Sequence, residues 1–403
     1  MKALDIAVVG AGIGGLAAAS LLAQDGHRVH LIERFDVPRP IGSGLVIQPV
    51  GLAVLDALGP GDLVRNLGAP LARMIGHSGR ALALDVDYAR GSPGTAIHRA
   101  SLFHVLWHNA QSAGVTIVTS SQVTSASSQA GKHRLHRVGQ SPLGPYDLIV
   151  DASGAGSLLS PLQARPLPFG AIWGQVPWPK GTVLPTDQLT QRYQAARRMA
   201  GVLPIGRLPD DPTPRAAIFW SLPAKQLATW HQSSFDDWRA DAAAFWPEFA
   251  PFIAQLTDAA QMTCARYGHG SLRKPYGEGI AFIGDSAHRA SPQLGQGANM
   301  ALLDAAALCV ALRMQSHVDL ALPHYAQMRR RHRWCYQSLS AAFTPMYQSD
   351  SRLLPILRDH VLGPIARLWP MRAILTQLVS GTLVRPLRGI QLDDFVLSRE
   401  QDA

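Results

Sequence analysis

The sequence predicts an α/β protein in three parts: a domain on a parallel sheet, a second domain on a mainly antiparallel sheet, and C-terminal helices. Three observations predict this. First, a β-branched apolar run near the N-terminus leads into a glycine-rich loop and then a helical pattern. Second, another glycine-rich loop, "GDSAHRASPQLGQG", precedes an apolar helix about 270 residues later. Third, the stretch between them holds many prolines and most of the tryptophans.

The composition is that of a globular chain. Its 403 residues are enough for two or three domains, and 47% of them are hydrophobic. The three cysteines, Cys264, Cys309 and Cys335, are widely spaced and form no CxxC pair, which argues against a zinc site or a disulfide framework. We expect no metal, no secretion signal, no membrane span and a reducing, cytoplasmic location.

The net charge of 37 − 28 = +9 favours anionic ligands or an anionic surface. The densest basic cluster is "RRRHR" at 329–333, which we interpret as a solvated stretch of helix. Nucleic-acid binding would require aromatic residues interleaved with the basic ones, so we expect no nucleic-acid partner.

The first elements form a βαβ unit. Residues 4–9, "LDIAVV", predict a strand, and "LAAASLLAQDG" predicts a helix that ends near Gly26. The segment "RVHLIER" predicts a second strand. Strand, turn, helix and strand within about 30 residues indicate a parallel sheet of the Rossmann type.

The later elements follow from the same patterns. We expect helices over 49–68 with a break at 59–61, over 100–113, from the second glycine loop to about 314, and beyond 319 with breaks at Pro345, Pro355, Pro364 and Pro370. We expect strands over 71–95 as a hairpin around Ser78-Gly79, near 115–118, 122–138 and 146–151, in patches over 160–270, and over 280–283.

These elements predict three domains. The first is a discontinuous nucleotide-binding domain of residues 1–70, 96–160 and 271–320. The second, which binds substrate, consists of 71–95 and 161–270. A C-terminal helical region covers 321–403.

The first glycine loop has the pattern of a dinucleotide site. Gly10, Gly12 and Gly15 fit GxGxxG between a strand and a helix, which allows a tight turn, close approach of a pyrophosphate and close helix packing. The helix N-terminus supplies free N–H groups and a partial positive charge. Glu33, at the end of the next strand, suits a ribose diol and repels a 2′-phosphate, which leaves FAD or NAD.

The second glycine loop favours FAD. One fingerprint is enough for NAD, but the ribityl chain and ring system of FAD extend well beyond the pyrophosphate. Asp285, after the strand "IAFIG", is suited to accept hydrogen bonds from ribityl hydroxyls. The segment from Gly295 to Gly297 presents backbone N–H groups at a helix start, which favour negative charge on a reduced flavin.

The second loop resembles the GD motif of the group A flavoprotein monooxygenases, which have the para-hydroxybenzoate hydroxylase fold. The positions that match the pattern GDAAHxxxPxxGQGxNxxxxDA are Gly284, Asp285, Ala287, His288, Pro292, Gly295, Gln296, Gly297, Asn299, Asp304 and Ala305. The segment "RASLFHVL" resembles the RxxLxxxL helix of that family, whose arginine reaches the flavin; here it would be Arg99.

Other segments extend this resemblance. "GSGLVIQPVGLAVLDALG" is similar to the family's GxGIxLxPNGxxxLxxLG, with Val50 in place of asparagine. The tail "YQSDSRLLPILRDHVLG" resembles the subfamily with ubiquinone-biosynthesis hydroxylases. The middle signature departs from GADGxxSxxR, because Ser153 and Ser160 replace its aspartate and arginine. In this respect "VDASGAGS" looks more like flavin halogenases and geranylgeranyl reductases, although "WGQVPWP" lacks the halogenase spacing WxWxIP.

The resemblance implies the activity and the site. NAD(P)H would reduce FAD, O₂ would form a C4a-hydroperoxide, and an aromatic or electron-rich small molecule would be hydroxylated. The catalytic candidates are Pro292, Gly295 and His288. The cofactor-binding candidates are Gly10, Gly12, Gly14, Gly15, Glu33, Arg34, Arg99, Asp285, Pro292, Gly295, Gln296, Gly297, Ala298 and Asn299.

Some choices stay open on the sequence. The base that activates the substrate could be His231, His269, Tyr193 or Tyr267, and the choice between NADH and NADPH is not fixed. One alternative function is a flavin halogenase or isoprenoid reductase. Another is a non-catalytic flavin-binding protein that associates with a membrane surface through its basic, apolar tail. The expected oligomeric state is a monomer or homodimer.

Overall fold

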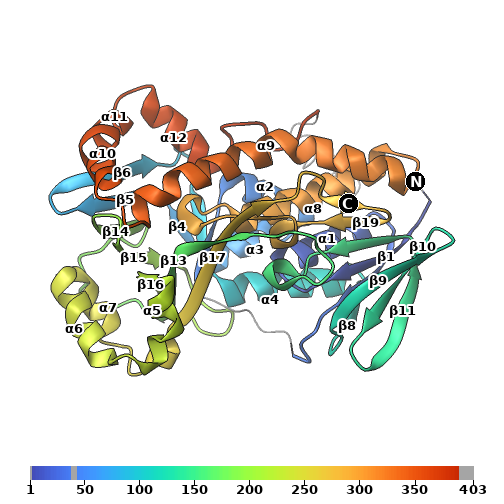
Figure 1. The fold of residues 1–403 in the computed structure, drawn as a ribbon, viewed down its shortest axis with the longest axis horizontal. Helices are drawn as coiled ribbons and strands as arrows, with labels where there is room; N and C mark the ends of the chain where they lie inside the picture. Colours follow the sequence, from blue (N-terminus) through green and yellow to red (C-terminus); the bar gives the residue numbers. More distant parts are fainter. Residues whose placement is uncertain (1, 38–42, 390–403) are drawn as a thin grey trace.

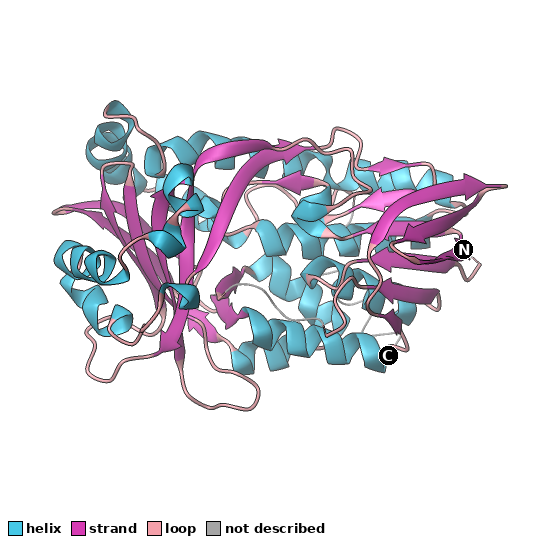
Figure 2. Cartoon of the chain, turned by 60° about the horizontal axis from the view of Figure 1, so that its bottom comes forward, coloured by secondary structure: helices cyan, strands magenta, loops and turns pink. Residues whose placement is uncertain are grey.

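The computed structural model describes residues 2–37 and 43–389. A six-stranded sheet forms the base of the first domain (Figures 1 and 2). Its strands, in spatial order, are β18 (Tyr276–Gly277), β19 (Ile280–Phe282), β12 (Leu148–Asp151), β1 (Asp5–Val9), β2 (Arg28–Ile32) and β8 (Thr116–Val118). All neighbours are parallel except β18 and β19. The continuous apolar run in β1 is buried, as expected for a parallel sheet covered on both faces.

Helices cover this sheet and include those predicted after the two glycine loops. They are α1 (Ile13–Gln24), α2 (Pro49–Leu58), α3 (Gly61–Leu67), α4 (Arg99–Ser112) and α8 (Gly297–Met314). The predicted break at 59–61 is confirmed, because α2 ends at Gly59 in the left-handed conformation. Within the described residues, α8 alone is long and apolar enough to cross a membrane, but 78% of it is buried in the protein core.

A three-stranded antiparallel sheet packs beside the parallel sheet. Its strands are β9 (Val123–Gln129), β10 (Lys132–Arg137) and β11 (Gln140–Tyr146). Leu135 and Tyr146 from this sheet share a core with Ala7 and Ile149 of the parallel sheet. The pattern over 122–138 therefore forms two strands of a meander.

The second domain is built on an eight-stranded sheet. Its spatial order is β20 (His288–Arg289), β17 (Thr263–Ser271), β13 (Arg165–Pro177), β16 (Arg215–Pro223), β15 (Arg198–Pro204), β14 (Gln188–Gln194), β5 (Arg73–Ser78) and β6 (Ala81–Asp87). The prediction of a mainly antiparallel sheet is confirmed, since only β14 and β5 are parallel. The predicted limits between the domains stay a prediction.

One face of this sheet is covered by short helices. They are α5 (Ala224–Ala228), α6 (Phe235–Phe245) and α7 (Ala250–Ile253). The core beneath them contains Trp220, Trp230, Trp238 and Trp246, so much of the tryptophan of the middle segment is core. A small sheet of β3 (Gly44–Ile47), β7 (Gly94–His98) and β4 (Ala69–Leu71) lies where the two domains meet.

The C-terminal region is mainly helical up to Ser380, as predicted, while residues 390–403 of that call lie outside the described residues. The long helix α9 (Val318–Tyr347) runs across both domains (Figure 1). It is followed by α10 (Leu353–Leu357), a π-helical turn (Arg358–Leu362), α11 (Gly363–Ala366) and α12 (Met371–Ser380). The expected breaks at Pro345, Pro355 and Pro364 are wrong. The helix α9 continues two residues beyond Pro345, Pro355 lies within α10, and Pro364 lies within α11.

The basic cluster at 329–333 lies on α9 but is solvated only in part. Arg330 and Arg331 are exposed, whereas Arg329, His332 and Arg333 are buried. The interpretation of the whole cluster as a solvated stretch is therefore wrong. One side of α9 faces the protein, and Arg329 is paired there with a buried carboxylate of α8.

Candidate functional site

The first glycine loop, between β1 and α1, leaves an open surface at its centre. A Cβ on Gly15 would lie 1.9 Å from the Gly10 carbonyl oxygen, so only glycine permits this close packing of helix on loop. By contrast, a Cβ on Gly12 would meet no protein atom within 4 Å. Free N–H groups at the start of α1 thus adjoin open space, the arrangement needed for a pyrophosphate.

Glu33 and Gly14 have contacts inside the protein. The Glu33 carboxylate is buried and accepts hydrogen bonds from the backbone N–H groups of Ala11 (2.8 Å) and Phe35 (3.1 Å). It therefore lies directly beside the loop. Gly14 faces α8, where its Cβ position is 3.0 Å from that of Ala301. The role of Gly14 as a cofactor ligand stays a prediction.

The second glycine loop also leaves an open surface at the start of a helix. Asp285, Pro292 and Gly297 are exposed, although their neighbours Ser286, His288 and Asn299 are buried. A Cβ on Gly297 would meet no protein atom within 4 Å. The N-terminus of the 18-residue helix α8 thus presents its unpaired N–H groups to open space.

Arg99 and Asp285 connect the two halves of the site. Arg99 is the first residue of α4, and its side chain reaches solvent. Protein nevertheless surrounds the guanidinium closely enough that desolvation lowers its pKa, and the negative charge of Asp285 opposes this shift. The two predicted cofactor-binding groups therefore lie within electrostatic reach of each other.

Asn299 and Gln296 hold the second loop in place. Asn299 accepts a hydrogen bond from the Gln48 backbone N–H (2.8 Å) and donates to the carbonyls of Val46 and Gly295. Gln296 donates to the Val379 carbonyl (2.9 Å). Both predicted cofactor residues are buried and bonded to protein, and Ala298 is half-buried between them.

Several buried polar atoms beside this loop have no protein partner. They include Nε2 of Gln48, Nε2 of Gln293 and Oε1 of Gln296. The Gln48 amide nitrogen lies 3.4 Å from the Cβ position of Gly295, and its Oε1 accepts from Tyr88 (2.5 Å). Buried donors and acceptors without a partner are rare in proteins, so these atoms fit a ligand with polar groups.

Residues 151–160, where the sequence differs from the family's middle signature, form a compact turn around Asp151. The Asp151 carboxylate is buried and accepts hydrogen bonds from the side chains of Ser153 and Ser157 (both 2.5 Å). Ser160 donates to the carbonyl of Ser286 (2.5 Å), and Ser286 donates to that of Asp151 (2.7 Å). The serines thus tie this turn to the second glycine loop.

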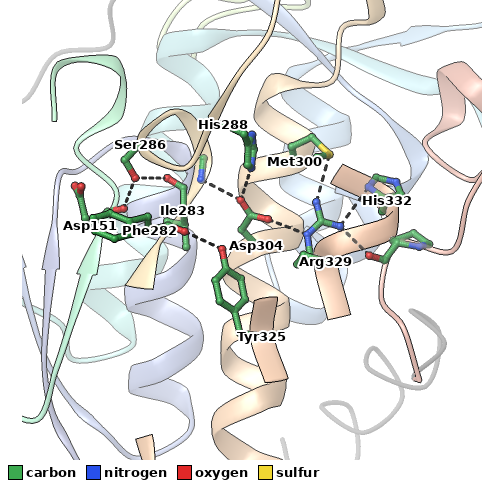
Figure 3. A network of polar contacts seen from close by, with 12 residues as sticks. Asp151, Phe282, Ile283, Ser286, His288, Met300, Asp304, Tyr325, Arg329 and His332 are labelled. Atoms are coloured by element: carbon green, nitrogen blue, oxygen red, sulfur yellow. Dashed lines mark hydrogen bonds and ion pairs between the residues drawn. The ribbon is translucent and has the colours of Figure 1, made fainter. Parts of the chain in front are cut away.

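His288 belongs to a buried network beneath the site (Figure 3). Asp304 of α8 accepts from His288 Nε2 (2.6 Å), the Gly284 N–H (3.0 Å) and Arg329 Nε of α9 (2.8 Å). Burial alone would raise the pKa of Asp304, but His288 and Arg329 hold it well below its usual range. The catalytic role of His288 stays a prediction; its observed contact is internal.

The face of the eight-stranded sheet opposite α5 to α7 carries aromatic side chains, and part of it packs against the small sheet, α9 and α12. Trp173 and Phe219 are opposite each other in β13 and β16, with ring centroids 4.6 Å apart. Trp173 also donates to the Tyr267 hydroxyl (2.8 Å). His269 Nε2 lies 3.3 Å from Thr344 Oγ1, and that oxygen is bonded to Ser291, next to Pro292. The aromatic face therefore reaches the second loop.

The candidate bases differ in their surroundings. Burial raises the pKa of Tyr193 and of Tyr267, which keeps both phenols protonated. His231 is exposed in a turn whose neighbour Trp230 packs on the opposite side of the sheet. Burial lowers the pKa of His269, which keeps its imidazole neutral and able to accept a proton.

Some site residues were missed by the sequence reasoning. Asp151 was quoted above only within the segment that differs from the family's middle signature. An aspartate at a strand end before a serine-rich turn is nevertheless a sequence signal for hydrogen bonds from the serine hydroxyls to its carboxylate. No local sequence pattern indicates that Gln48 belongs to the site, because its position depends on packing between α2 and the second loop. In the described part of the chain, no three His, Cys, Asp or Glu side chains are grouped to hold a metal ion.

These observations fit FAD. The first loop suits the pyrophosphate, and Glu33 adjoins it. Asp285, Arg99 and the N-terminus of α8 belong to the second part of the site, where Nε2 of Gln48 and Oε1 of Gln296 have no protein partner. Arg34 is exposed, with its guanidinium over the Phe35 ring, and its role stays a prediction.

Comparisons with known proteins agree with this site. Residues 3–142 and 239–337 match the family described as "FAD binding domain". The chain is 27% identical over 393 residues to 6-methylpretetramide 4-monooxygenase of Streptomyces rimosus, covering 94% of this chain and 92% of the relative. It is 27% identical over 350 residues to the FAD-dependent urate hydroxylase of Klebsiella pneumoniae, covering 82% and 86%. The structure of Klebsiella pneumoniae HpxO complexed with FAD and uric acid matches with a TM-score of 0.77 at 22% identity, covering 94% and 98%.

Proposed function

Because this chain belongs to the group A flavoprotein monooxygenases, FAD-dependent enzymes with the para-hydroxybenzoate hydroxylase fold, we propose that it uses NAD(P)H and O₂ to hydroxylate an aromatic small molecule. The observation that carries this proposal is the meeting of three surfaces. The two open helix N-termini, at Gly12 and Gly297, and the aromatic face of the eight-stranded sheet converge around the second loop.

The residues that would hold FAD follow from the open positions. The N–H groups after Gly12 would bind the pyrophosphate, and Glu33 would bind the adenosine ribose. Asp285 would accept from ribityl hydroxyls, and Arg99 would supply a positive charge near it. When bound and reduced, FAD supplies the activation of O₂.

The protein contributes charge, position and exclusion of water. The N-terminal dipole of α8 favours negative charge next to Gly297, an effect worth roughly 0.3–2 kcal/mol. Pro292 has no N–H, so that position offers no backbone donor to water or to bound oxygen. His269, whose imidazole reaches the loop through Thr344, would take the substrate proton through its unpaired Nδ1, since Nε2 faces Thr344.

The aromatic face supports a ring-bearing substrate. The half-buried Trp173 and Tyr267 offer ring faces and edges for offset or edge-to-face contact, and the buried Phe219 packs against Trp173. By their names, the two relatives described above act on 6-methylpretetramide and on urate, which are both ring systems. We therefore propose that the substrate binds between this face and Pro292.

NAD(P)H is the proposed reductant, and the turn at 151–160 is its candidate contact. That turn has hydroxyls where the family has an aspartate and an arginine. Without the arginine, no charge at this position selects a 2′-phosphate, so both NADH and NADPH are to be assayed.

The proposal is tested with the purified holoprotein. We expect flavin absorbance and NAD(P)H consumption that rises when the right aromatic compound is added. The product should be about 16 Da heavier than the substrate, because the reduced flavin cofactor activates O₂ and one oxygen atom is inserted. A halide-dependent product would instead indicate a halogenase. NAD(P)H oxidation with saturation of a carbon–carbon double bond would indicate a reductase.

A further inference from the structure

The outer surface of the last helices is apolar. Within the described residues, eight large hydrophobic side chains between 353 and 374 are exposed, and we call them the C-terminal apolar face: Leu353, Ile356, Leu357, Val361, Ile365, Leu368, Trp369 and Ile374. They belong to α10, the π-helical turn, α11, α12 and the turn between α11 and α12, which gather at one end of the long axis (Figure 1). Clustered apolar exposure of this kind marks an interaction site.

Between residues 353 and 368 the apolar side chains face outward and an arginine faces the protein, the opposite of an ordinary surface helix. The spacing Leu353, Ile356/Leu357, Val361, Ile365 and Leu368 is close to helical, yet this stripe faces outward. The inward side carries Arg358, which is only 1% exposed. Its guanidinium lies 4.8 Å from the Tyr193 ring and 5.1 Å from the Tyr347 ring, and it pairs with Asp359 at 2.6 Å. A segment that buries its arginine and exposes its leucines is suited to bind an apolar partner on its outer side.

The rim of the face carries positive charge. Arg352 and Arg367 are exposed there, together with the side chain of His360. Carboxylates in and beside this stretch are paired, since Asp359 pairs with Arg358, Asp87 with Arg372 and Asp350 with Arg197. Basic residues around an apolar stripe are the pattern of a segment that lies in the surface of an anionic bilayer.

The exposed Trp369 also indicates contact with a membrane surface. It is 85% exposed in the turn between α11 and α12, next to Leu368 at 62%. Tryptophan is favoured at membrane–water interfaces, because its ring is amphipathic. A two-fold contact with a second copy would instead bring the arginine rims of both copies together, which is unfavourable.

We propose that the C-terminal apolar face binds the surface of an anionic lipid bilayer. The contact is peripheral, since the apolar side chains project from short helices that lie on the protein. This inference does not depend on the proposed hydroxylation.

The test is co-sedimentation of the holoprotein with lipid vesicles. We expect binding to phosphatidylcholine vesicles that contain phosphatidylglycerol, weaker binding to phosphatidylcholine alone, and release by salt. The double variant Leu368→Ser/Trp369→Ser should bind at least about tenfold more weakly, the effect of roughly 1.4 kcal/mol of lost apolar contact. Arg352→Glu should weaken binding to the anionic vesicles only.

Trp334→Ser is the matched control, because Trp334 on α9 is 72% exposed outside this face. It should bind vesicles as the wild type does. Equal binding by the Leu368→Ser/Trp369→Ser variant overturns the proposal. So does a wild-type dimer in light scattering that this double variant converts to a monomer while vesicle binding is absent; that result assigns the face to a second copy.

Discussion

The imidazole Nε2 of His288 lies 2.6 Å from Oδ2 of Asp304, and both side chains are buried. This contact joins the second glycine loop to α8, and Arg329 joins the same carboxylate to α9. Arg329 in turn lies 3.3 Å from Nδ1 of His332, whose Nε2 is bonded to the Gly381 carbonyl (Figure 3). The loop that faces the cofactor site is thus held by a chain of polar contacts that reaches the C-terminal region.

Asp304→Asn is expected to lower the free energy of unfolding by about 3–5 kcal/mol, because it leaves the buried Arg329 charge without its counter-ion. Urea denaturation of the apoprotein measures this. The second variant Asp304→Asn/Arg329→Met should recover part of the loss, since it removes the unpaired charge as well. The control Asp62→Asn should change stability by less than about 1 kcal/mol, because Asp62 is exposed and its pair with Arg65 is a surface contact. Equal effects of Asp304→Asn and Asp62→Asn would contradict the network.

His332 predicts a loss of stability in mild acid. Burial lowers the pKa of His332 to about 3, with the Arg329 charge as a further cause. The folded protein therefore keeps this imidazole neutral at a pH where the unfolded chain, with an ordinary histidine pKa of about 6.5, takes up a proton. A depressed histidine pKa favours unfolding as pH falls, so this group alone should remove about 1.4 kcal/mol between roughly pH 7.5 and 5.5.

The measurement compares wild type with His332→Gln, whose amide can still donate to the Gly381 carbonyl. Denaturation curves at both pH values should show a smaller fall in the variant than in the wild type, by about the 1.4 kcal/mol that one titrating group contributes over this interval. Parallel pH profiles would show that His332 titrates alike in the folded and unfolded states.

Gly12 and Gly15 should respond differently to alanine. A methyl group at Gly12 meets no protein atom, and its φ of −76° suits any residue, so Gly12→Ala should leave the apoprotein's melting temperature unchanged. It should weaken FAD binding on the order of tenfold, because the methyl would occupy space that the pyrophosphate needs. Gly15→Ala should destabilise the apoprotein by roughly 1–3 kcal/mol through overpacking against Gly10. Thermal melts with FAD titrations separate these effects; unchanged FAD affinity in Gly12→Ala would contradict the assignment of the first loop.

Arg99→Met should weaken FAD binding while the apoprotein stays folded, because the guanidinium is already partly desolvated and no described hydrogen bond depends on it. The loss of its charge should also alter the flavin reduction potential, which a merely structural residue would leave unchanged. Potentiometry of the reconstituted protein checks this. The exposed Arg34→Met serves as the comparison, since it tests the other arginine that the sequence assigned to the cofactor.

The sequence predicted the parts of the fold that depend on local patterns. The βαβ unit, the helix break at 59–61 and a hairpin within 71–95 follow from glycine positions and apolar periodicity, and the structure has each of them. The hairpin itself covers only β5 and β6, residues 73–87. The contacts made across the chain had no local pattern. Asp304 reads as one polar residue in an apolar helix, and only the position of α9 reveals that Arg329 neutralises it.

The site, like the fold, was predictable where it depends on local motifs. Gly12, Gly297 and Asp285 lie in such motifs, so their position at an open surface could be expected from the sequence. The bonds of Asn299 to β3 and of Gln296 to Val379 depend on tertiary packing, and they place two predicted cofactor residues against protein. The reversed polarity of the C-terminal apolar face is likewise visible only once Arg358 is seen between two tyrosine rings.

The most direct test of the central claim is a crystal structure of the protein with FAD. The pyrophosphate should lie against the N–H groups that follow Gly12, and the ring system should lie between the Gly295–Gly297 segment and the Trp173 face, with Asp285 on the ribityl chain. A complex in which Asp285 and Gly297 face solvent while the ring system binds elsewhere would contradict the claim that both loops hold one cofactor.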